Sequence, residues 1–512
     1  MSFCMIESGG DCCHDQHYGC RRFPPIHLLL EQLMSIVTHS LRPLRQMITG
    51  LAVLCGTFMA SAAVIAAEPA PASAGPFIDY QLASPKPMLA KIKENKIEKP
   101  SLTFGMIKLT DCCPLVVARE LGFFADEGLS VKIEVQANWK VVQERVVSME
   151  LDGSHMLYNH PIGARIGYLG QANVITPFNI SINGKGITVS MALWKAMQEK
   201  DPSLKEAGYA LPVKADTLKA IAKERSGAGN PLRFGMTYPS GSHNTALRYW
   251  LAAGGVHPGY YDGFNDPVGK RDADILLSVV PPPQMVANMS ANTVDGFCVG
   301  EPWNQQAVKD SIGVAALGDQ YVFNGGPDKI FGVAEEWAEK YPNTLVAVVK
   351  ALIRANQWID ESPEHRKLTV EMLANKAYIG ANVDVLAESM MGTYQYQKGD
   401  RREAKDFNIF YRRFASFPFK SHTVWGLTQA RRWGMIPSNK SDSWYMDVAD
   451  KVSRTDIYRK AFALLLKEGK VKAEDLPADD YQSYPAEAFI DKIAFDPKKP
   501  NDYIKQFAIG LK

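Results

Sequence analysis

Side chains that could carry chemistry are spread thinly along this 512-residue chain. His155 and His160 lie close together in sequence, but no carboxylate or third histidine has a placement that would complete a metal site with them. The stretch 12–20 is rich in cysteine and histidine, yet its spacing matches no standard zinc pattern. Cys112 and Cys113 alone are too few for a reactive cluster. We therefore expect neither a metal nor a cofactor.

The sequence motifs of common enzymes are missing from the body of the chain. It has no phosphate-binding loop (G-x-x-x-x-G-K-[ST]), no nucleophile elbow (G-x-S-x-G), no H-E-x-x-H zinc motif and no C-x-x-C pair. The formal net charge is only +2, which gives no sign of a nucleic-acid-binding surface. With 46% apolar residues, the length is sufficient for two domains with substantial cores. The chain is predicted to be a globular protein with no catalytic residues.

The N-terminus has the order of a secretory signal. Arg42 and Arg45 precede an apolar run at 47–67 that ends in small residues, and a Pro/Ala stretch follows at 68–75. We assign 1–67 to a leader and signal and 68–100 to a linker. A permanent transmembrane helix is the alternative, because the run is near the length that spans a bilayer. The body is expected in the periplasm, either free or associated with the membrane face.

Elements that would position a site repeat along the body as strand, turn and helix units, the pattern of an α/β fold. Four units are recognised, in which a strand region leads through a turn into a helix start, at 102–114, 155–161, 232–243 and 297–302. In open α/β sheets ligands bind beyond the C-terminal ends of the strands. Helix N-termini gathered there present free N–H groups and partial positive charge, which favours a small anion.

The body divides into two predicted lobes. The first lobe comprises 101–189 and 300–512, and the second comprises 190–299, because a Lys-rich, weakly apolar stretch and a Gly/Asp-rich insertion set the middle segment apart. Two crossings between the lobes would form a hinge. Beyond residue 335 the apolar spacing predicts extra C-terminal helices, at 344–358, 404–414, 424–433 and 455–466.

Several motifs in the body resemble those of the nitrate- and bicarbonate-binding proteins of ABC importers. These motifs are the stretches 280–289 and 297–304 and the segments 421–425 and 432–434. The run 118–129 with the strand 131–135 resembles the wider group of solute-binding proteins that also includes sulfonate and thiamine-precursor binders. The resemblance covers nearly everything from about residue 102 onward. It implies a two-lobed periplasmic-binding-protein type II fold, shaped as a C-clamp, that holds an oxyanion in the cleft and delivers it to the permease and ATPase subunits of an ABC importer.

The resemblance also implies the ligand-binding residues. Trp139 matches a tryptophan that follows the second strand, and His243 matches a histidine at the start of a second-lobe helix. Gly300 fits a backbone donor, because glycine allows close approach to a ligand. Lys329 matches the lysine that neutralises the anion and favours nitrate over bicarbonate. Lys329→Glu is expected to abolish nitrate binding without unfolding the lobes.

One position departs from the pattern of these families. Where nitrate and bicarbonate binders place a glutamine in an Asn-Gly-Gln-Gly turn, this chain has Lys185. If Lys185 points into the cleft, it joins the ligand-binding set as a second cation; if it points outward, the turn is merely solvated. The exact ligand stays open between nitrate, nitrite, bicarbonate and an organosulfonate. Two functions of a different class also stay open: an enzyme related to thiamine-precursor synthases, and a signalling subunit that reports anion levels.

Overall fold

The computed structural model describes residues 96–511, which fall within one compact unit. The predicted leader, signal and most of the linker lie outside the described residues. Within the described part, no helix is long and apolar enough to cross a membrane.

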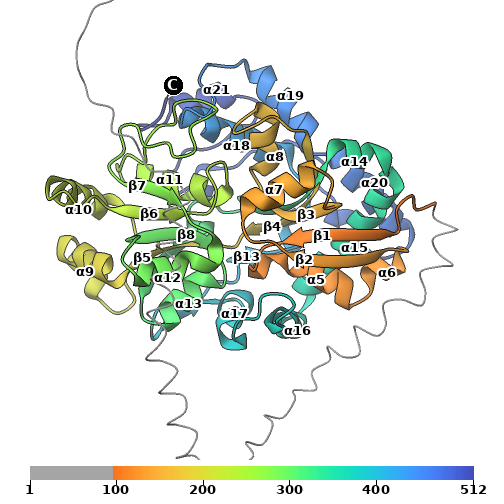
Figure 1. Cartoon of the computed structure of the whole chain (residues 1–512), viewed down its shortest axis with the longest axis horizontal. Coiled ribbons are helices and arrows are strands. Elements are labelled where there is room, and N and C mark those ends of the chain that lie inside the picture. The colour runs from red at the N-terminus through yellow and green to blue at the C-terminus, as the bar shows by residue number, and fades with distance from the viewer. Residues whose placement is uncertain (1–95, 512) are drawn as a thin grey trace, which may run out of the picture. The chain divides into compact units, whose positions relative to one another are not determined.

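A first, six-stranded sheet has the order β13-β4-β10-β3-β1-β2 (Figure 1). Its strands are β1 (Ser101–Met106), β2 (Ser130–Val135), β3 (Gly153–Leu157), β4 (Val174–Asn183), β10 (Pro327–Ala334) and β13 (Asn408–Ile409). β1 runs parallel to β2 and β3, whereas β10 is antiparallel to β3 and β4. The parallel strands therefore end at one edge, where the predicted turns of the first two units lie.

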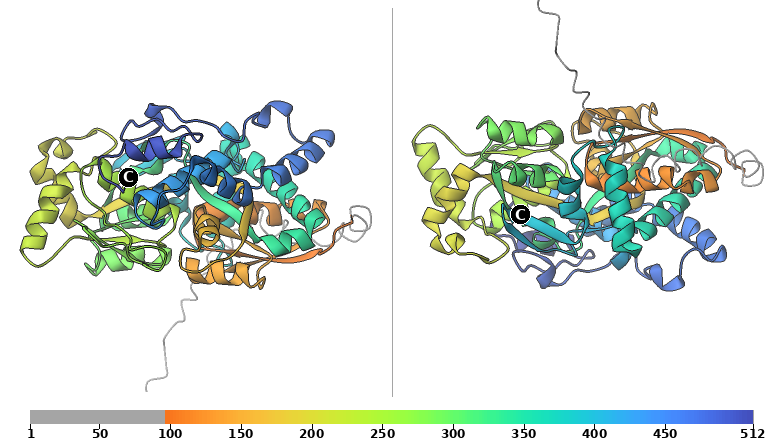
Figure 2. Two further views of the ribbon diagram at one scale, coloured as in Figure 1. Left: turned by 90° about the horizontal axis from the view of Figure 1, so that it is seen from above. Right: turned by 90° about the horizontal axis from the view of Figure 1, so that it is seen from below.

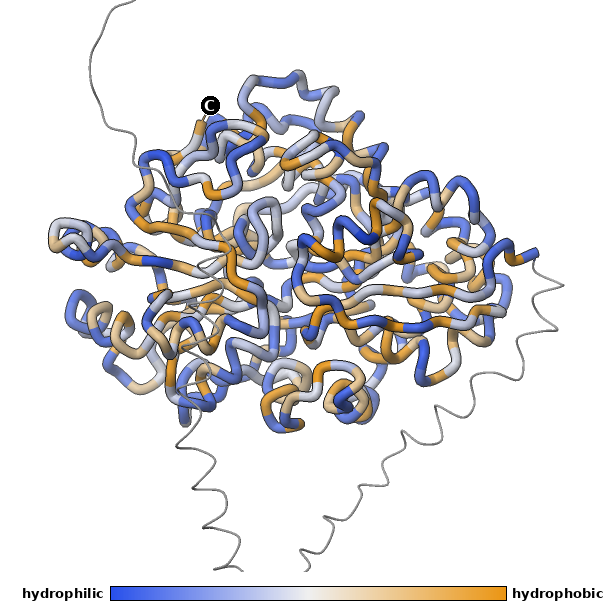
Figure 3. Tube along the Cα trace, in the orientation of Figure 1, coloured by the Kyte–Doolittle hydropathy of each residue, from blue (hydrophilic) through white to orange (hydrophobic). Residues whose placement is uncertain are grey.

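A second, five-stranded sheet has the order β7-β6-β8-β5-β9. Its strands are β5 (Lys185–Ser190), β6 (Arg233–Met236), β7 (Leu276–Val279), β8 (Gly296–Gly300) and β9 (Gly313–Gly318). β6 runs parallel to β7 and β8, and β5 is antiparallel to β8 and β9. The two sheets lie side by side in Figure 1, and apolar residues follow the strands of both in Figure 3. This confirms the predicted α/β architecture.

Helices surround both sheets. They are α5 (Cys113–Glu120), α6 (Phe123–Asp126), α7 (Trp139–Val147), α8 (His160–Ile166), α9 (Met191–Lys200), α10 (Asp216–Gly227), α11 (Ser242–Ala253), α12 (Met285–Ser290), α13 (Trp303–Lys309), α14 (Glu335–Lys340), α15 (Pro342–Glu361), α16 (Pro363–Ala374), α17 (Val383–Met390), α18 (Lys420–Arg432), α19 (Asp442–Val452), α20 (Thr455–Lys467) and α21 (Pro500–Lys505). A separate hairpin pairs β11 (Thr393–Gln397) with β12 (Asp400–Glu403).

Chain crossings between the sheets differ from the predicted lobe boundaries. The chain leaves the first sheet after β4 and enters β5 through Gly184, whose φ of 86° suits glycine. It returns between β9 and β10, across 319–326. By strand membership, the second sheet thus begins before residue 190 and continues past residue 299.

One predicted C-terminal helix, 404–414, was wrong. The segment instead contains β13, which pairs with β4, and a short 3-10 turn. The reason is Asp360, whose carboxylate Oδ2 accepts hydrogen bonds from the backbone N–H groups of Phe410, Tyr411 and Arg412. Those donors are then not available to the carbonyls of a continuing helix. The other three predictions correspond to α15, α18 and α20.

The C-terminal segment joins parts of the chain that belong to both sheets. Figure 2 shows the blue C-terminal segments extending across the body in both views. Tyr503 in α21 contacts Tyr249 of α11 through a 3.1 Å hydroxyl pair, and Phe489 stacks on Phe323. α18 carries Trp425, whose indole N–H donates to the Tyr503 hydroxyl. An aromatic cluster thus fixes the C-terminal helices against α11.

Candidate functional site

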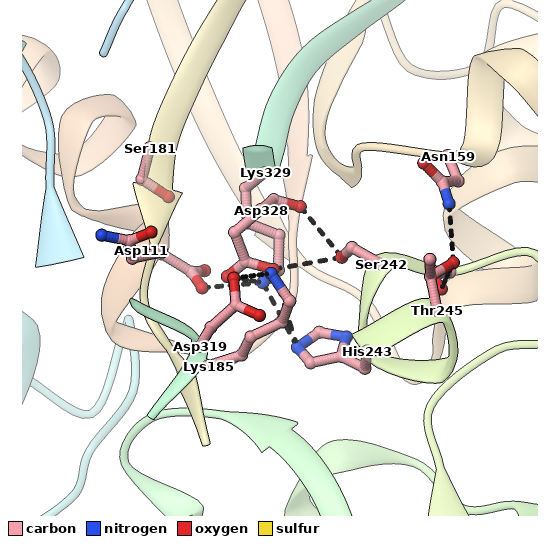
Figure 4. A network of polar contacts seen from close by, with 12 residues as sticks. Asp111, Asn159, Ser181, Lys185, Ser242, His243, Thr245, Asp319, Asp328 and Lys329 are labelled. Atoms are coloured by element: carbon pink, nitrogen blue, oxygen red, sulfur yellow. Dashed lines mark hydrogen bonds and ion pairs between the residues drawn. The ribbon is translucent and has the colours of Figure 1, made fainter. Parts of the chain in front are cut away.

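Three charged or polar side chains of the predicted site meet in the interior, between the two sheets. Figure 4 shows Lys185 at the start of β5, His243 at the start of α11 and Lys329 in β10 close together. Gly300 ends β8 beside them: a Cβ atom placed on it would lie 3.5 Å from His243 Nε2. The structure therefore brings four of the five predicted residues into one cluster.

Lys329 is fully buried and surrounded by polar partners. Its ammonium donates to Asp111 Oδ2 at 2.8 Å and to Asp328 Oδ2 at 2.6 Å. Its third neighbour is His243 Nε2, at 3.4 Å. A surface position for Lys329 is excluded, since the side chain has 0% exposure. The ammonium is available for an anion only at the expense of one of these contacts.

Lys185 points inward. Its ammonium donates to Asp319 Oδ2 at 2.5 Å and lies 3.5 Å from Asp328 Oδ1. Burial opposes its charged form, but the two carboxylates outweigh burial and raise the pKa of Lys185 above its usual value. The orientation left open by the sequence is therefore settled: the turn carries a buried cation next to Lys329.

His243 connects the second sheet to this cluster. Its Nδ1 pairs with the Thr237 hydroxyl at 2.9 Å, while Nε2 faces Lys329 and lies 4.0 Å from Asp328 Oδ1. Burial, and then the nearby Lys329 charge, hold the pKa of His243 well below its usual value. Imidazole is thus neutral here, with Nε2 accepting from the ammonium.

Sequence reasoning did not include four members of this cluster among the ligand-binding residues: Asp111, His155, Asp319 and Asp328. Asp111 follows β1, and its Oδ1 accepts from His155 Nε2 at 2.7 Å while Oδ2 binds Lys329. Asp328 precedes Lys329, and its Oδ1 accepts from the Ser242 hydroxyl at 3.1 Å. Asp111 stands in a recognised turn, and Asp328 adjoins Lys329 in sequence. Asp319 had no such signal, because only the fold brings it to Lys185.

Trp139 occupies a different place from the other four predicted residues. It is the first residue of α7, only 1% exposed, and its ring centroid lies 5.3 Å from the His155 ring and 5.7 Å from the His160 ring. Its indole Nε1 is buried and has no hydrogen-bond partner in the described part of the chain. Trp139 thus contacts the cluster through His155, which binds Asp111.

A cavity of about 670 Å³ adjoins the cluster from the side of Trp139. Trp139 and Asn138 line it from α7 and its N-cap, and Thr237 and Tyr238 line it from the turn after β6. The cavity therefore reaches elements of both sheets. Thr237 is also the hydroxyl partner of His243, so the cavity wall continues into the buried cluster.

We predict that Gly300→Ala weakens ligand binding about tenfold, which corresponds to about 1.4 kcal/mol. The added Cβ would lie 3.2 Å from Asp111 Oδ2 and 3.5 Å from His243 Nε2, so it would narrow the space beside both groups. Titration calorimetry of the variant measures the change. Gly227→Ala is the matched control, because a Cβ there meets nothing within 4 Å. Unchanged affinity in Gly300→Ala would show that no ligand approaches this glycine.

Among the described residues, no group of three or more His, Cys, Asp or Glu side chains is arranged to hold a metal ion. Each aspartate of the cluster is instead bound to an ammonium group. The three cysteines in the described part are buried, and burial raises the pKa of the Cys298 thiol well above its usual value. A thiol in that state is a poor nucleophile.

Comparison with known proteins identifies the relatives of this chain. The model of the NMT1-like family matches residues 95–374. The nitrate/nitrite binding protein NrtA of Nostoc sp. is 33% identical over 437 residues, covering 83% of this chain and 90% of the relative. The nitrate import ATP-binding protein NrtC of Synechocystis sp. is 34% identical over 81% of this chain and 56% of its own length.

A solved structure is similar to the whole described fold. The crystal structure of the periplasmic nitrate-binding protein NrtA from Synechocystis PCC 6803 aligns with a TM-score of 0.70 and 29% identity, covering 81% of this chain and 100% of that chain. This likeness confirms the predicted periplasmic-binding-protein fold.

Proposed function

The chain belongs to the NMT1-like family, and from this premise we propose that it captures nitrate between its two sheets and delivers it to an ABC importer. The observation that carries the proposal is the buried ammonium of Lys329, which lies beside His243, and His243 in turn lies beside Gly300. Ammonium, imidazole and glycine backbone N–H groups are donors suited to a small planar oxyanion. The relatives named for nitrate binding support the choice of ligand.

The proposed partners are a membrane permease and an ATPase. A relative named as a nitrate import ATP-binding protein contains a segment similar to this chain, which links the fold to import driven by ATP. The protein would act outside the cytoplasm, in the periplasm, as a binding protein and not as an enzyme. Its relatives named as binding proteins support that role.

We further propose that each sheet is the centre of one lobe. The first lobe would then comprise 96–183 and 327–511, and the second 185–318, with the crossings at Gly184 and 319–326 as the hinge. The five predicted ligand residues would come from both lobes. Closure would then bring Lys185 and His243 to Lys329.

Nitrite is the second candidate ligand. Two buried lysines, not one, line the proposed site. A second ammonium attracts small anions in general and does not select for the planar shape of nitrate. The Nostoc relative is named for both nitrate and nitrite. Bicarbonate carries a hydroxyl group that donates a hydrogen bond, but the Lys329 ammonium has no acceptor for it. Lys329 therefore suits bicarbonate less well than nitrate or nitrite.

Titration calorimetry of the purified mature chain with nitrate, nitrite, bicarbonate and an alkanesulfonate tests the proposal. We expect saturable binding of one nitrate per chain, with nitrite as a weaker competitor. Chloride at the same ionic strength is the control for nonspecific anion effects. A clear isotherm with bicarbonate or the sulfonate, and none with nitrate, would contradict nitrate as the ligand.

A further inference from the structure

Buried charges in the candidate site do not balance. Its core contains the ammonium groups of Lys185 and Lys329, whereas three carboxylates face them, from Asp111, Asp319 and Asp328. Their side chains are between 0% and 4% exposed. With both imidazoles of the cluster neutral, the ionised groups sum to one excess negative charge before any anion enters.

The carboxylates are already engaged. Asp111 binds His155 through Oδ1 and Lys329 through Oδ2. Asp328 binds Lys329, and Asp319 binds Lys185. A metal cation would have to displace an ammonium group to reach these oxygens. A proton needs only one basic lone pair, and that of His243 Nε2 becomes free if Lys329 turns its N–H from His243 to the anion.

A bound monoanion would add a second uncompensated negative charge to this buried site. Uncompensated charge in a protein interior is costly, and titratable groups there change protonation instead of carrying it. The anion would also lie close to Lys329, whose positive charge, after burial, lowers the pKa of His243 in the absence of a ligand. Anion binding therefore favours protonation of a nearby base.

His243 is the base placed to respond. Its Nδ1 pairs with Thr237, and its Nε2 accepts from Lys329 at 3.4 Å. To hold an oxyanion, Nε2 must become a donor, either in the neutral tautomer with its proton on Nε2 or in the imidazolium. The imidazolium also supplies the positive charge that offsets the anion. The anion would then lie between two cationic donors, the Lys329 ammonium and the His243 imidazolium.

Other titratable groups surround His243 on the elements packed against it. These are Asp111 after β1, His155 in β3, Lys185 in β5, Glu301 after β8, Asp319 after β9, and Asp328 and Lys329 in β10. Burial raises the pKa of Glu301 to about 7 and that of Asp319 to about 6, so both are competing proton acceptors. Neither is in contact with Lys329, where the anion is proposed to bind, whereas His243 is, so the charge of the anion acts most directly on His243.

We propose that the protein binds its anion together with one proton, and that His243 receives this proton. The inference rests on the proposed function and deepens it: nitrate is captured as the anion, and the protein binds the accompanying proton. No bond of the anion breaks; a proton from solvent binds the Nε2 lone pair of His243. Affinity for nitrate would then fall about tenfold for each pH unit of increase, once the free histidine is neutral.

Calorimetric titration with nitrate in two buffers of different ionisation enthalpy, at one pH near 7.5, tests the proton uptake. The difference between the two binding enthalpies gives the number of protons taken up, and we expect about one per nitrate. Saturable binding with no uptake, and affinity independent of pH, overturns this inference and leaves nitrate binding intact. No binding in either buffer overturns both proposals.

Nitrogen-15 NMR of histidine-labelled protein tests whether His243 is the acceptor. We expect the His243 ring signals to change from a neutral to an imidazolium pattern when nitrate saturates the protein, and His243→Gln assigns them by their loss. His365, which stacks on Trp358 with ring centroids 4.0 Å apart, is the internal control and should not change. Proton uptake with a neutral His243 would overturn the assignment to this residue.

Discussion

Lys329→Glu should abolish nitrate binding and also lower the free energy of unfolding by about 3–5 kcal/mol, the usual cost of breaking a buried ion pair. From sequence alone the fold was expected to survive this change. The structure alters that expectation, because Lys329 is 0% exposed and lies between Asp111 and Asp328. A glutamate there would place a third carboxylate against two others, and Lys185, 3.5 Å from Asp328 Oδ1, would be the ammonium that remains in the cluster.

Denaturant unfolding and calorimetry of the same Lys329→Glu preparation measure the two effects separately. Lys460→Glu is the matched control, since Lys460 is an exposed residue of α20 and its reversal should change stability by less than about 0.5 kcal/mol. If Lys329→Glu folds with normal stability and still binds nitrate, Lys329 is not part of the site.

The periodic elements of the fold could be predicted because local rules fix them. Pro114 lies in the first turn of α5 and Gly122 has a φ of 76°, as the helix-start and helix-stop signals require. The predicted helix 404–414 failed because a distant carboxylate, Asp360, binds its backbone donors. Local spacing contains no information about such a partner.

Four of the predicted site residues lie together in the structure, but their counter-ions were not predicted. Lys185, His243, Gly300 and Lys329 stand at strand ends or helix starts, where a motif in the sequence can mark them. Two of their acidic partners come from far along the chain: Asp319 is 134 positions from Lys185, and Asp111 is 218 positions from Lys329. Only the assembled fold gives the charge balance on which anion and proton binding depend.

Lys185 illustrates how such partners decide a question that sequence leaves open. A lysine in a Gly-rich turn is ordinarily solvated, and inward and outward orientations were both compatible with the sequence. Asp319 and Asp328 make the inward orientation stable, since they raise the pKa of Lys185 despite its burial. The substitution of lysine at the family's glutamine position is therefore accompanied by a carboxylate in contact with it.

Acidification from pH 6.5 to 5.5 should lower the free energy of unfolding, and His160 and His422 together should contribute about 2 kcal/mol to this loss. Burial lowers the pKa of each to about 3, so both stay neutral in the folded protein over this range. In the unfolded chain they become protonated below about pH 6.5. The unfolded state then binds more protons, and stability is lost as pH falls.

Asp319 acts in the opposite direction, because burial raises its pKa to about 6 and the folded state therefore binds a proton there before the unfolded state does. Glu301, whose pKa burial raises to about 7, acts in the same direction as Asp319. Burial also lowers the pKa of His243 and His155, so four buried histidines oppose these two carboxylates and the net slope keeps its sign. Urea unfolding at several pH values measures it. His422→Gln should reduce the slope by about 1 kcal/mol per pH unit. An unchanged slope in His422→Gln would show that this imidazole gains its proton inside the folded protein.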